Sequence, residues 1–338
     1  MWMLLALALA LGATSRKISL DDNHHHHSHH HHHYHHEDNF GPFTDSFVHF
    51  LNENMNRFKY ALDAFATYGQ TGTFGGKHSE QQYIHRTPVL FIHGNSDSAL
   101  NYGAPDGSNS GWNRQLAYFK SRGYSFAEMY GLTYGDRTLA HSFMRSINCN
   151  DLLGHRKFAE AILEYTGSYE LNVVAHSMGV TYARALIQGG KHYLNGQECD
   201  VGESLAERIE TLIAISSANY GMCLCEMHSH FPACNESLGD NCNEYAEGYS
   251  TVLRRLNDQG KDANFVFSLW SSGDQIIGTG GNMVHGRQTS LVPHSDMNIH
   301  FSGLTHFEMK TETVSQQYYL LKHHTLPRSM YNNSAEQF

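Results

Sequence analysis

An apolar segment at residues 171–175 runs directly into the pattern small-x-Ser-x-Gly, present here as Ala175-His176-Ser177-Met178-Gly179. Helix-type spacing of apolar residues continues from 178 to 188. A strand that turns sharply into a helix needs small residues two positions before and two positions after the serine, because neighbouring backbones come together there. The pattern therefore predicts a nucleophile elbow, in which backbone strain holds the hydroxyl of Ser177 out at the carboxyl end of a sheet.

A second turn stands upstream of the elbow. The apolar run at residues 88–92 predicts a buried strand, and it ends in His93-Gly94-Asn95. The backbone N–H groups of Asn95 and Met178 are the expected donors of an oxyanion hole, a role that requires no particular side chain. His93 and His176 are interpreted as hydrogen-bonded structural histidines, because the base of this topology is expected near the end of the chain.

The acid and the base should follow the serine in that order, each on a loop after a strand. Asp274 lies in Ser271-Ser272-Gly273-Asp274, just past the apolar run at 265–270, and is the expected acid. His306 lies on a late loop before the final helix and is the expected base. Asp258 lies in or just after a helix, and no clear strand end lies beside Asp296. The lower-ranked alternatives are Asp258 and Asp296 for the acid, and His300, His285 and His294 for the base.

Strand-type and helix-type segments alternate along the chain. The apolar residues of 44–68 recur every three or four positions and predict one amphipathic helix that begins near Thr44 or Asp45. The alternation predicts an α/β fold with a mostly parallel, doubly wound sheet flanked by helices. The other expected segments are strands at 88–92, 126–130, 171–175, 209–215 and 265–270, and helices at 112–122, before Gly167, at 178–188 and at 313–321.

Length and charge exclude some classes of protein. The chain has 338 residues without an internal linker after the first forty, which favours one large domain. Its formal net charge is -10 and no Lys/Arg-rich block occurs, so a nucleic-acid partner is not expected. No stretch reaches the ~18 apolar residues of a membrane span, and a transmembrane segment is not expected.

The N-terminal region predicts export. Residues 2–11 are apolar and are followed by small residues, which indicates a signal peptide at 1–15, although no Lys or Arg precedes Arg16; a frayed apolar terminus is the alternative. A disordered His-rich segment is expected at 16–42 and the main domain at 43–338. The tract at 24–36 could bind a divalent metal such as Zn²⁺ or Cu²⁺, gain charge in acid, or remain a solvated tail or a purification tag.

Six cysteines agree with an oxidising, extracellular location, and three disulfides are expected. Six cysteines can form three disulfides in 15 ways. A Cys223–Cys225 bond is not expected, because one intervening residue rarely permits disulfide geometry, so 12 of these ways remain. Sequons at Asn235 and Asn332 are compatible with a secreted glycoprotein.

The Cys-rich segment at 220–245 is interpreted either as a disulfide-pinned cap over the active site or as a stapled surface loop. A zinc site is a further alternative there, with Cys223, Cys225, His228, His230 and Cys234 as ligands.

These motifs resemble those of the class 2 lipases, relatives of the small bacterial triacylglycerol lipases, over about residues 88–321. The resemblance rests on His93-Gly94-Asn95, on the Ala-x-Ser-x-Gly variant of the elbow, on Asp274 in its Ser-Ser-Gly-Asp turn and on Leu304-Thr305-His306-Phe307. It implies an α/β-hydrolase fold and a lipid ester as substrate, either in solution or at a lipid–water interface. It implies no metal or organic cofactor. The roles it implies are Ser177 as nucleophile, Asp274 as acid, His306 as base, and Asn95 and Met178 as oxyanion donors.

The sequence leaves two groups of alternatives open. The elbow specifies a mechanism and not an acyl length, so a phospholipase, an acyltransferase or a short-chain esterase would use the same residues. A secreted lipid-binding or metal-binding protein without catalysis is the alternative from another class. Loss of Ser177, Asp274 or His306 would favour that class, and all three are present.

Overall fold

The computed structural model describes residues 39–103, 108–225, 231–234, 250–278, 282–284 and 286–330. Contacts divide the chain into two units, 1–39 and 40–338, and the fold described here is that of the second. The expected signal peptide, the His tract at 24–36 and both sequons lie outside the described residues.

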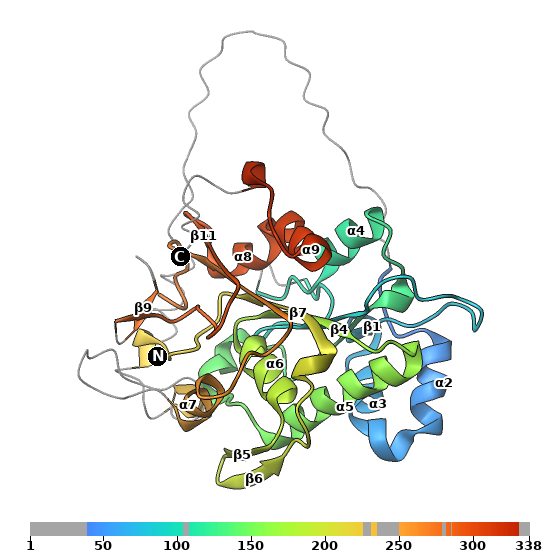
Figure 1. Cartoon of the computed structure of the whole chain (residues 1–338). Coiled ribbons are helices and arrows are strands. Elements are labelled where there is room, and N and C mark those ends of the chain that lie inside the picture. The colour runs from blue at the N-terminus through green and yellow to red at the C-terminus, as the bar shows by residue number, and fades with distance from the viewer. Residues whose placement is uncertain are drawn as a thin grey trace, which may run out of the picture. The chain divides into compact units, whose positions relative to one another are not determined.

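A central sheet of seven strands organises this unit (Figure 1). Six strands are parallel to their neighbours, and only the edge strand β1 pairs antiparallel, with β3. The strands occur in the order β1 (Thr73–Phe74), β3 (Met129–Leu132), β2 (Val89–Ile92), β4 (Leu171–His176), β7 (Ile209–Ile215), β8 (Phe265–Ser271) and β11 (Met297–Phe301). The mostly parallel, doubly wound sheet is confirmed, and with it the α/β-hydrolase fold.

Helices cover both faces of the sheet (Figure 1). Successive residues of a strand point to opposite faces, so Val89 and Phe91 pack in one core while Leu90 and Ile92 pack in the other. The helices of the second core are α2 (Asp45–Glu53), α3 (Met55–Tyr68), α5 (Cys149–Thr166), α6 (Met178–Gln188) and α7 (Thr251–Asn257). Those of the first core are α4 (Asn113–Ser121), α8 (His306–Glu312) and α9 (Val314–His323).

Short elements complete the fold. Two hairpins lie outside the main sheet, β5 (Lys191–Leu194) with β6 (Gln197–Asp200), and β9 (Met283–Val284) with β10 (Arg287–Gln288). Short 3₁₀ segments occur at Gly69–Thr71, Phe126–Glu128, Leu139–Met144, Ala206–Arg208, Cys223–Cys225 and Arg328–Met330.

Two of the expected elements need correction. The single helix predicted over 44–68 is wrong, because the chain forms α2 and α3 with a break at Asn54. The side chain of Asn54 donates to the carbonyl of Phe50, and its backbone is non-helical, so the first helix ends there. The strand predicted at 126–130 starts only at Met129, because Ser125 and Glu128 form a capping box around a 3₁₀ turn.

Two elements beside the site are absent from the prediction. The strand β11 mixes polar and apolar residues in the sequence Met-Asn-Ile-His-Phe, which hides its strand character. Asp296 therefore directly precedes a strand, contrary to the expectation. Helix α8 begins at His306, which was expected on a loop, because Thr305 and Glu308 form a capping box at its start.

Two disulfides are described, and neither joins Cys223 to Cys225, as expected. Cys149 at the start of α5 bonds Cys199 in the β5–β6 hairpin, and Cys225 bonds Cys234. Cys223 is also disulfide-bonded. Among the described helices, none is both long enough and apolar enough to span a membrane.

Candidate active site

Ser177 occupies a strained turn between β4 and α6. Its backbone has φ 55° and ψ -129°, a conformation that costs a non-glycine residue energy, and its N–H donates to the carbonyl of Ile215 at 2.8 Å. A Cβ atom at Gly179 would lie 2.4 Å from the carbonyl oxygen of His93, so no larger residue fits two positions after the serine. Ser177 itself is partly exposed to solvent. The backbone thus has the strand–turn–helix form expected of an elbow.

Asp274 and His306 form a buried hydrogen-bonded pair. The Nδ1 atom of His306 lies 2.9 Å from Oδ2 of Asp274, and both side chains are almost completely buried. A carboxylate only accepts, so Nδ1 carries the proton and donates it to Asp274. The Nε2 atom of His306 is left as the unprotonated nitrogen when the ring is neutral.

The loop that carries the acid closely approaches the segment just before α8, the helix that carries the base. A Cβ atom at Gly273 would lie 2.7 to 3.0 Å from backbone atoms of Gly303, so glycine at 273 permits this contact. The side chain of Gln275 accepts a hydrogen bond from the N–H of His306 at 3.1 Å. Sequence reasoning missed Gln275, and its position next to Asp274 was the only signal that could have indicated it.

The environment of Asp274 favours its ionised form. Burial alone would raise the pKa of its carboxyl, but the His306 imidazole and the N–H donor at Ile277 outweigh burial. The pKa of Asp274 therefore lies below its ordinary value, and at neutral pH a negative charge faces Nδ1 of His306.

His176 connects the base to the elbow. Its Nε2 donates to the carbonyl of His306 at 3.0 Å, and the two rings lie 4.6 Å apart. Its Nδ1 is buried and has no hydrogen-bond partner among the described residues. Burial, together with repulsion from His306 and Lys310, lowers the pKa of His176 well below its ordinary value. The ring of His176 is therefore neutral, and it packs against the ring of His306.

His93 has the hydrogen bonds of a structural histidine, as the sequence suggests. Its Nδ1 donates to the carbonyl of Gly94 at 2.7 Å, and its Nε2 accepts from the N–H of Tyr134 at 3.1 Å. A proton on Nε2 would face the N–H of Tyr134, so that two donors would meet without an acceptor. Burial lowers the pKa of His93 to about 3, so the ring is neutral at ordinary pH.

The two expected oxyanion donors lie on the turns that flank Ser177. Met178 is the first residue of α6, where a backbone N–H has no acceptor within the helix. The N–H of Asn95 has no hydrogen-bond acceptor within the described residues. The side chain of Asn95 is fixed, since it donates to the carbonyl of Ser142 and accepts from Arg145. Both N–H groups are thus available to a ligand.

The lower-ranked residues lie elsewhere. Asp258 is exposed at the end of α7. Asp296 precedes β11 and pairs with Lys261, which places it at the amino edge of the sheet, whereas Asp274 and His306 follow the carboxyl ends of β8 and β11. His300 stacks on Trp270 within the sheet, and His294 is exposed. The last of these residues, His285, lies outside the described residues.

The described parts of the Cys-rich segment pack beside the acid. A small apolar cluster contains Met222, Cys225 and Cys234 together with Ile277, whose N–H donates to Asp274. The ring of Phe231 lies 5.6 Å from that of Phe143.

Metal binding finds no support in the described residues. No group of three or more His, Cys, Asp or Glu side chains there is placed to hold a metal ion. The alternative zinc site of the Cys-rich segment is wrong, because Cys223, Cys225 and Cys234 are all disulfide-bonded and disulfide sulfur is not a thiolate ligand. The His tract lies outside the described residues, and its metal binding stays a prediction.

Comparison with known proteins gives one family. The family model described as lipase (class 2) matches residues 86–319. No curated protein matches the chain. Aspergillus fumigatus lipase B is 14% identical with a TM-score of 0.46, over 75% of this chain and 56% of that one, so this chain spans little more than half of its length. Carboxylesterase CesB from Bacillus subtilis is 10% identical with a TM-score of 0.37, and the match covers 84% of this chain and 100% of that one.

Proposed function

The chain belongs to the class 2 lipase family, and we propose that it hydrolyses carboxylic ester bonds of lipids with Ser177, His306 and Asp274 as its catalytic triad. The observation that carries this proposal is the buried hydrogen bond between Asp274 and His306, formed beside the strained turn that bears Ser177. The hydroxyl, the imidazole and the carboxylate come from segments that follow β4, β11 and β8 at the same edge of the sheet, as catalysis by a serine nucleophile requires.

The proposed reaction begins with proton transfer from Ser177 Oγ to Nε2 of His306 as the oxygen attacks the ester carbonyl. Asp274 stabilises the imidazolium that results and keeps the proton of Nδ1 in place. The N–H groups of Asn95 and Met178 bind the oxyanion. His306 then protonates the departing alcohol, and a water molecule activated by the same Nε2 hydrolyses the acyl-enzyme.

Secretion is part of the proposal. The disulfides Cys149–Cys199 and Cys225–Cys234 support an oxidising compartment, where such bonds persist. We expect a signal peptide at 1–15, a His-rich segment at 16–42 and the lipase domain at 43–338. The N-terminal sequence of the exported protein would test the first boundary.

The Cys-rich segment is proposed to border the acyl site. Its described residues pack on Ile277 and Phe143, next to the acid and to the loop that holds Asn95. Apolar side chains at that place favour an apolar acyl chain over a polar one. This contact supports the cap interpretation over a surface loop remote from the site.

The proposed function is tested by hydrolysis of short-chain and long-chain p-nitrophenyl esters and of emulsified triacylglycerol. The wild-type protein should hydrolyse at least one of them, and Ser177→Ala should lose activity by orders of magnitude. The ratio of emulsion to short-ester activity separates a lipase from an esterase. Absence of hydrolysis by the folded wild type on all three substrates would refute the proposal and favour a binding protein.

A further inference from the structure

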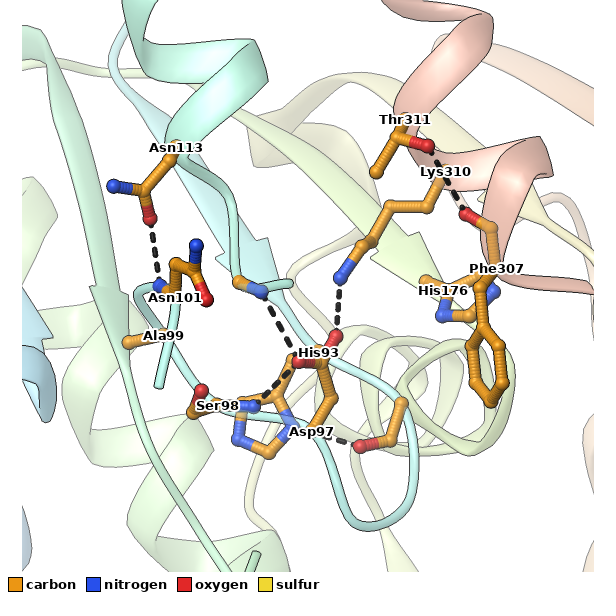
Figure 2. Close-up of polar contacts among 12 residues, drawn as sticks. His93, Asp97, Ser98, Ala99, Asn101, Asn113, His176, Phe307, Lys310 and Thr311 are labelled. Carbon is orange, nitrogen blue, oxygen red and sulfur yellow. Dashed lines mark hydrogen bonds and ion pairs between the residues drawn. The ribbon is translucent and has the colours of Figure 1, made fainter. Parts of the chain in front are cut away.

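A buried ion pair joins the oxyanion turn to the helix that carries the base. Lys310 of α8 donates to Asp97, which follows the turn His93-Gly94-Asn95, and both side chains are almost completely buried. Figure 2 shows the Lys310 side chain reaching from its helix to the Asp97 carboxylate, with Phe307 on the same helix and His93 beside the loop.

Each partner lies within a few residues of a group in the proposed mechanism. Asp97 comes two residues after Asn95, and its own N–H closes the turn by donating to the carbonyl of Gly94 at 3.2 Å. Lys310 comes four residues after His306, about one helical turn along α8. A shift of either side chain would therefore move a backbone that holds an expected donor or the expected base.

The pair is anchored on both sides. The second carboxylate oxygen of Asp97 accepts from the N–H groups of Ser98 at 2.8 Å and Gly111 at 3.1 Å. The ammonium group of Lys310 lies 5.3 Å from the centre of the Trp112 ring. If either charged group moved to stay in contact with a displaced partner, it would break these contacts. The geometry between the turn and α8 is therefore fixed.

Stability alone does not account for a charged pair at this place. Removing two charges from water costs free energy, and well-packed apolar residues in place of a buried pair often give equal or greater stability. Apolar residues do not supply a directional contact between this turn and helix α8. We infer that Asp97 and Lys310 are positioning residues, which set the oxyanion donor at Asn95 and the base His306 at the distance that the reaction needs.

This inference rests on the proposed function, and a double-substitution cycle tests it. Asp97→Asn and Lys310→Met each leave one buried group without its partner, and the double variant leaves a neutral pair. We expect each single variant to lower kcat by about tenfold to a hundredfold with little change in KM, since misplacement by an ångström costs about that much. The double variant should unfold at a temperature closer to that of the wild type and still have the low kcat.

A matched control separates positioning from stability. Arg184 and Asp262 form another ion pair with both side chains buried, and it contacts neither the oxyanion turn nor α8. Asp262→Asn should lower the unfolding temperature and leave kcat of the folded enzyme unchanged. Recovery of kcat together with stability in the double variant would overturn the inference, as would an equal loss of kcat in Asp262→Asn. If the single variants do not fold, the kcat of the double variant alone tests the inference.

Amide hydrogen exchange tests the connection without reference to activity. Asp97→Asn should increase exchange in residues 306–312, and Lys310→Met should increase it in residues 93–97, while Asp262→Asn changes neither segment. Unchanged exchange in both segments would overturn the inference even if the wild type hydrolyses esters. Wild-type protein without ester hydrolysis, but with these reciprocal changes, would refute the proposed function and retain the structural connection.

Discussion

The imidazole of His306 and the carboxylate of Asp274 lie 2.9 Å apart, although 32 positions separate them in the sequence. They meet because β8 and β11 are neighbouring parallel strands, and both residues follow the carboxyl ends of these strands. The arrangement fixes one tautomer of His306, with the proton on Nδ1.

Asp274→Asn should abolish most activity without unfolding the protein. The amide has nearly the shape of the carboxylate, but it cannot stabilise an imidazolium and it favours the wrong tautomer of His306. We expect kcat to fall by about 10³-fold to 10⁴-fold. The matched control is Asp258→Asn, which changes an exposed carboxylate and should leave kcat unaltered. Full activity in Asp274→Asn would show that another residue is the acid.

Gly94→Ala should lower activity because the added methyl group has no room. A Cβ atom at this position would lie 2.9 Å from Cβ of Ser177 and 3.0 Å from Nδ1 of His176. The elbow and the oxyanion turn would have to separate, so we expect kcat to fall by about a hundredfold. Gly260→Ala is the control, since nothing lies within 4 Å of a Cβ atom there. Equal kcat values for the two variants would contradict this account.

The free energy of unfolding should fall as the pH drops below about 6.5, in part because of His93. Burial lowers the pKa of this ring from 6.5 to about 3, so between these values the unfolded chain binds a proton that the folded chain does not. Stability is then complete above pH 6.5 and decreases on acidification, by up to about 1.4 kcal/mol per pH unit for one such histidine.

Urea unfolding of the wild type and of His93→Gln between pH 4 and pH 7 measures this contribution. Glutamine keeps a donor and an acceptor but does not titrate, so the variant should show a smaller dependence of stability on pH. Parallel curves for the two proteins would mean that His93 is charged in the folded state or makes no contribution.

Removal of the disulfide Cys149–Cys199 should reduce stability and spare catalysis. The bond closes a loop of about 50 residues, for which the chain-entropy model gives about 4 kcal/mol. It joins the start of α5 to the β5–β6 hairpin and contacts no proposed catalytic group. Thermal unfolding of the double variant Cys149→Ser/Cys199→Ser should show a lower midpoint, while kcat at 25 °C stays near that of the wild type. A large loss of kcat in the folded variant would contradict this separation.

The centre of the fold could be predicted from the sequence because its signals are local. Residues 209–215 and 178–188 are continuous or regularly spaced apolar runs, and the structure places β7 and α6 at those bounds. Gly167 ends α5 in a left-handed conformation, as expected of a glycine after a helix. The order of serine, acid and histidine likewise follows from the topology, which is why Asp274 and His306 could be chosen as partners.

Other features depend on contacts between distant segments, and no local pattern indicates them. The strand β11 is defined by its pairing with β8 and not by its composition. The contacts of Gln275 with His306 and of Asp97 with Lys310 span 31 and 213 positions, so single-chain periodicity carries no signal for them. The break at Asn54 arises from one side chain that satisfies a backbone carbonyl, against an apolar spacing that continues through it.

The identity of the nucleophile tests the account most directly. The folded protein should be labelled with a fluorophosphonate, digested, and analysed by mass spectrometry. We predict one covalent adduct, on Ser177, that is absent from Ser177→Ala and strongly reduced in Asp274→Asn. An adduct on another residue, or no adduct on a wild-type protein shown to be folded, would contradict the assignment of Ser177 as the nucleophile.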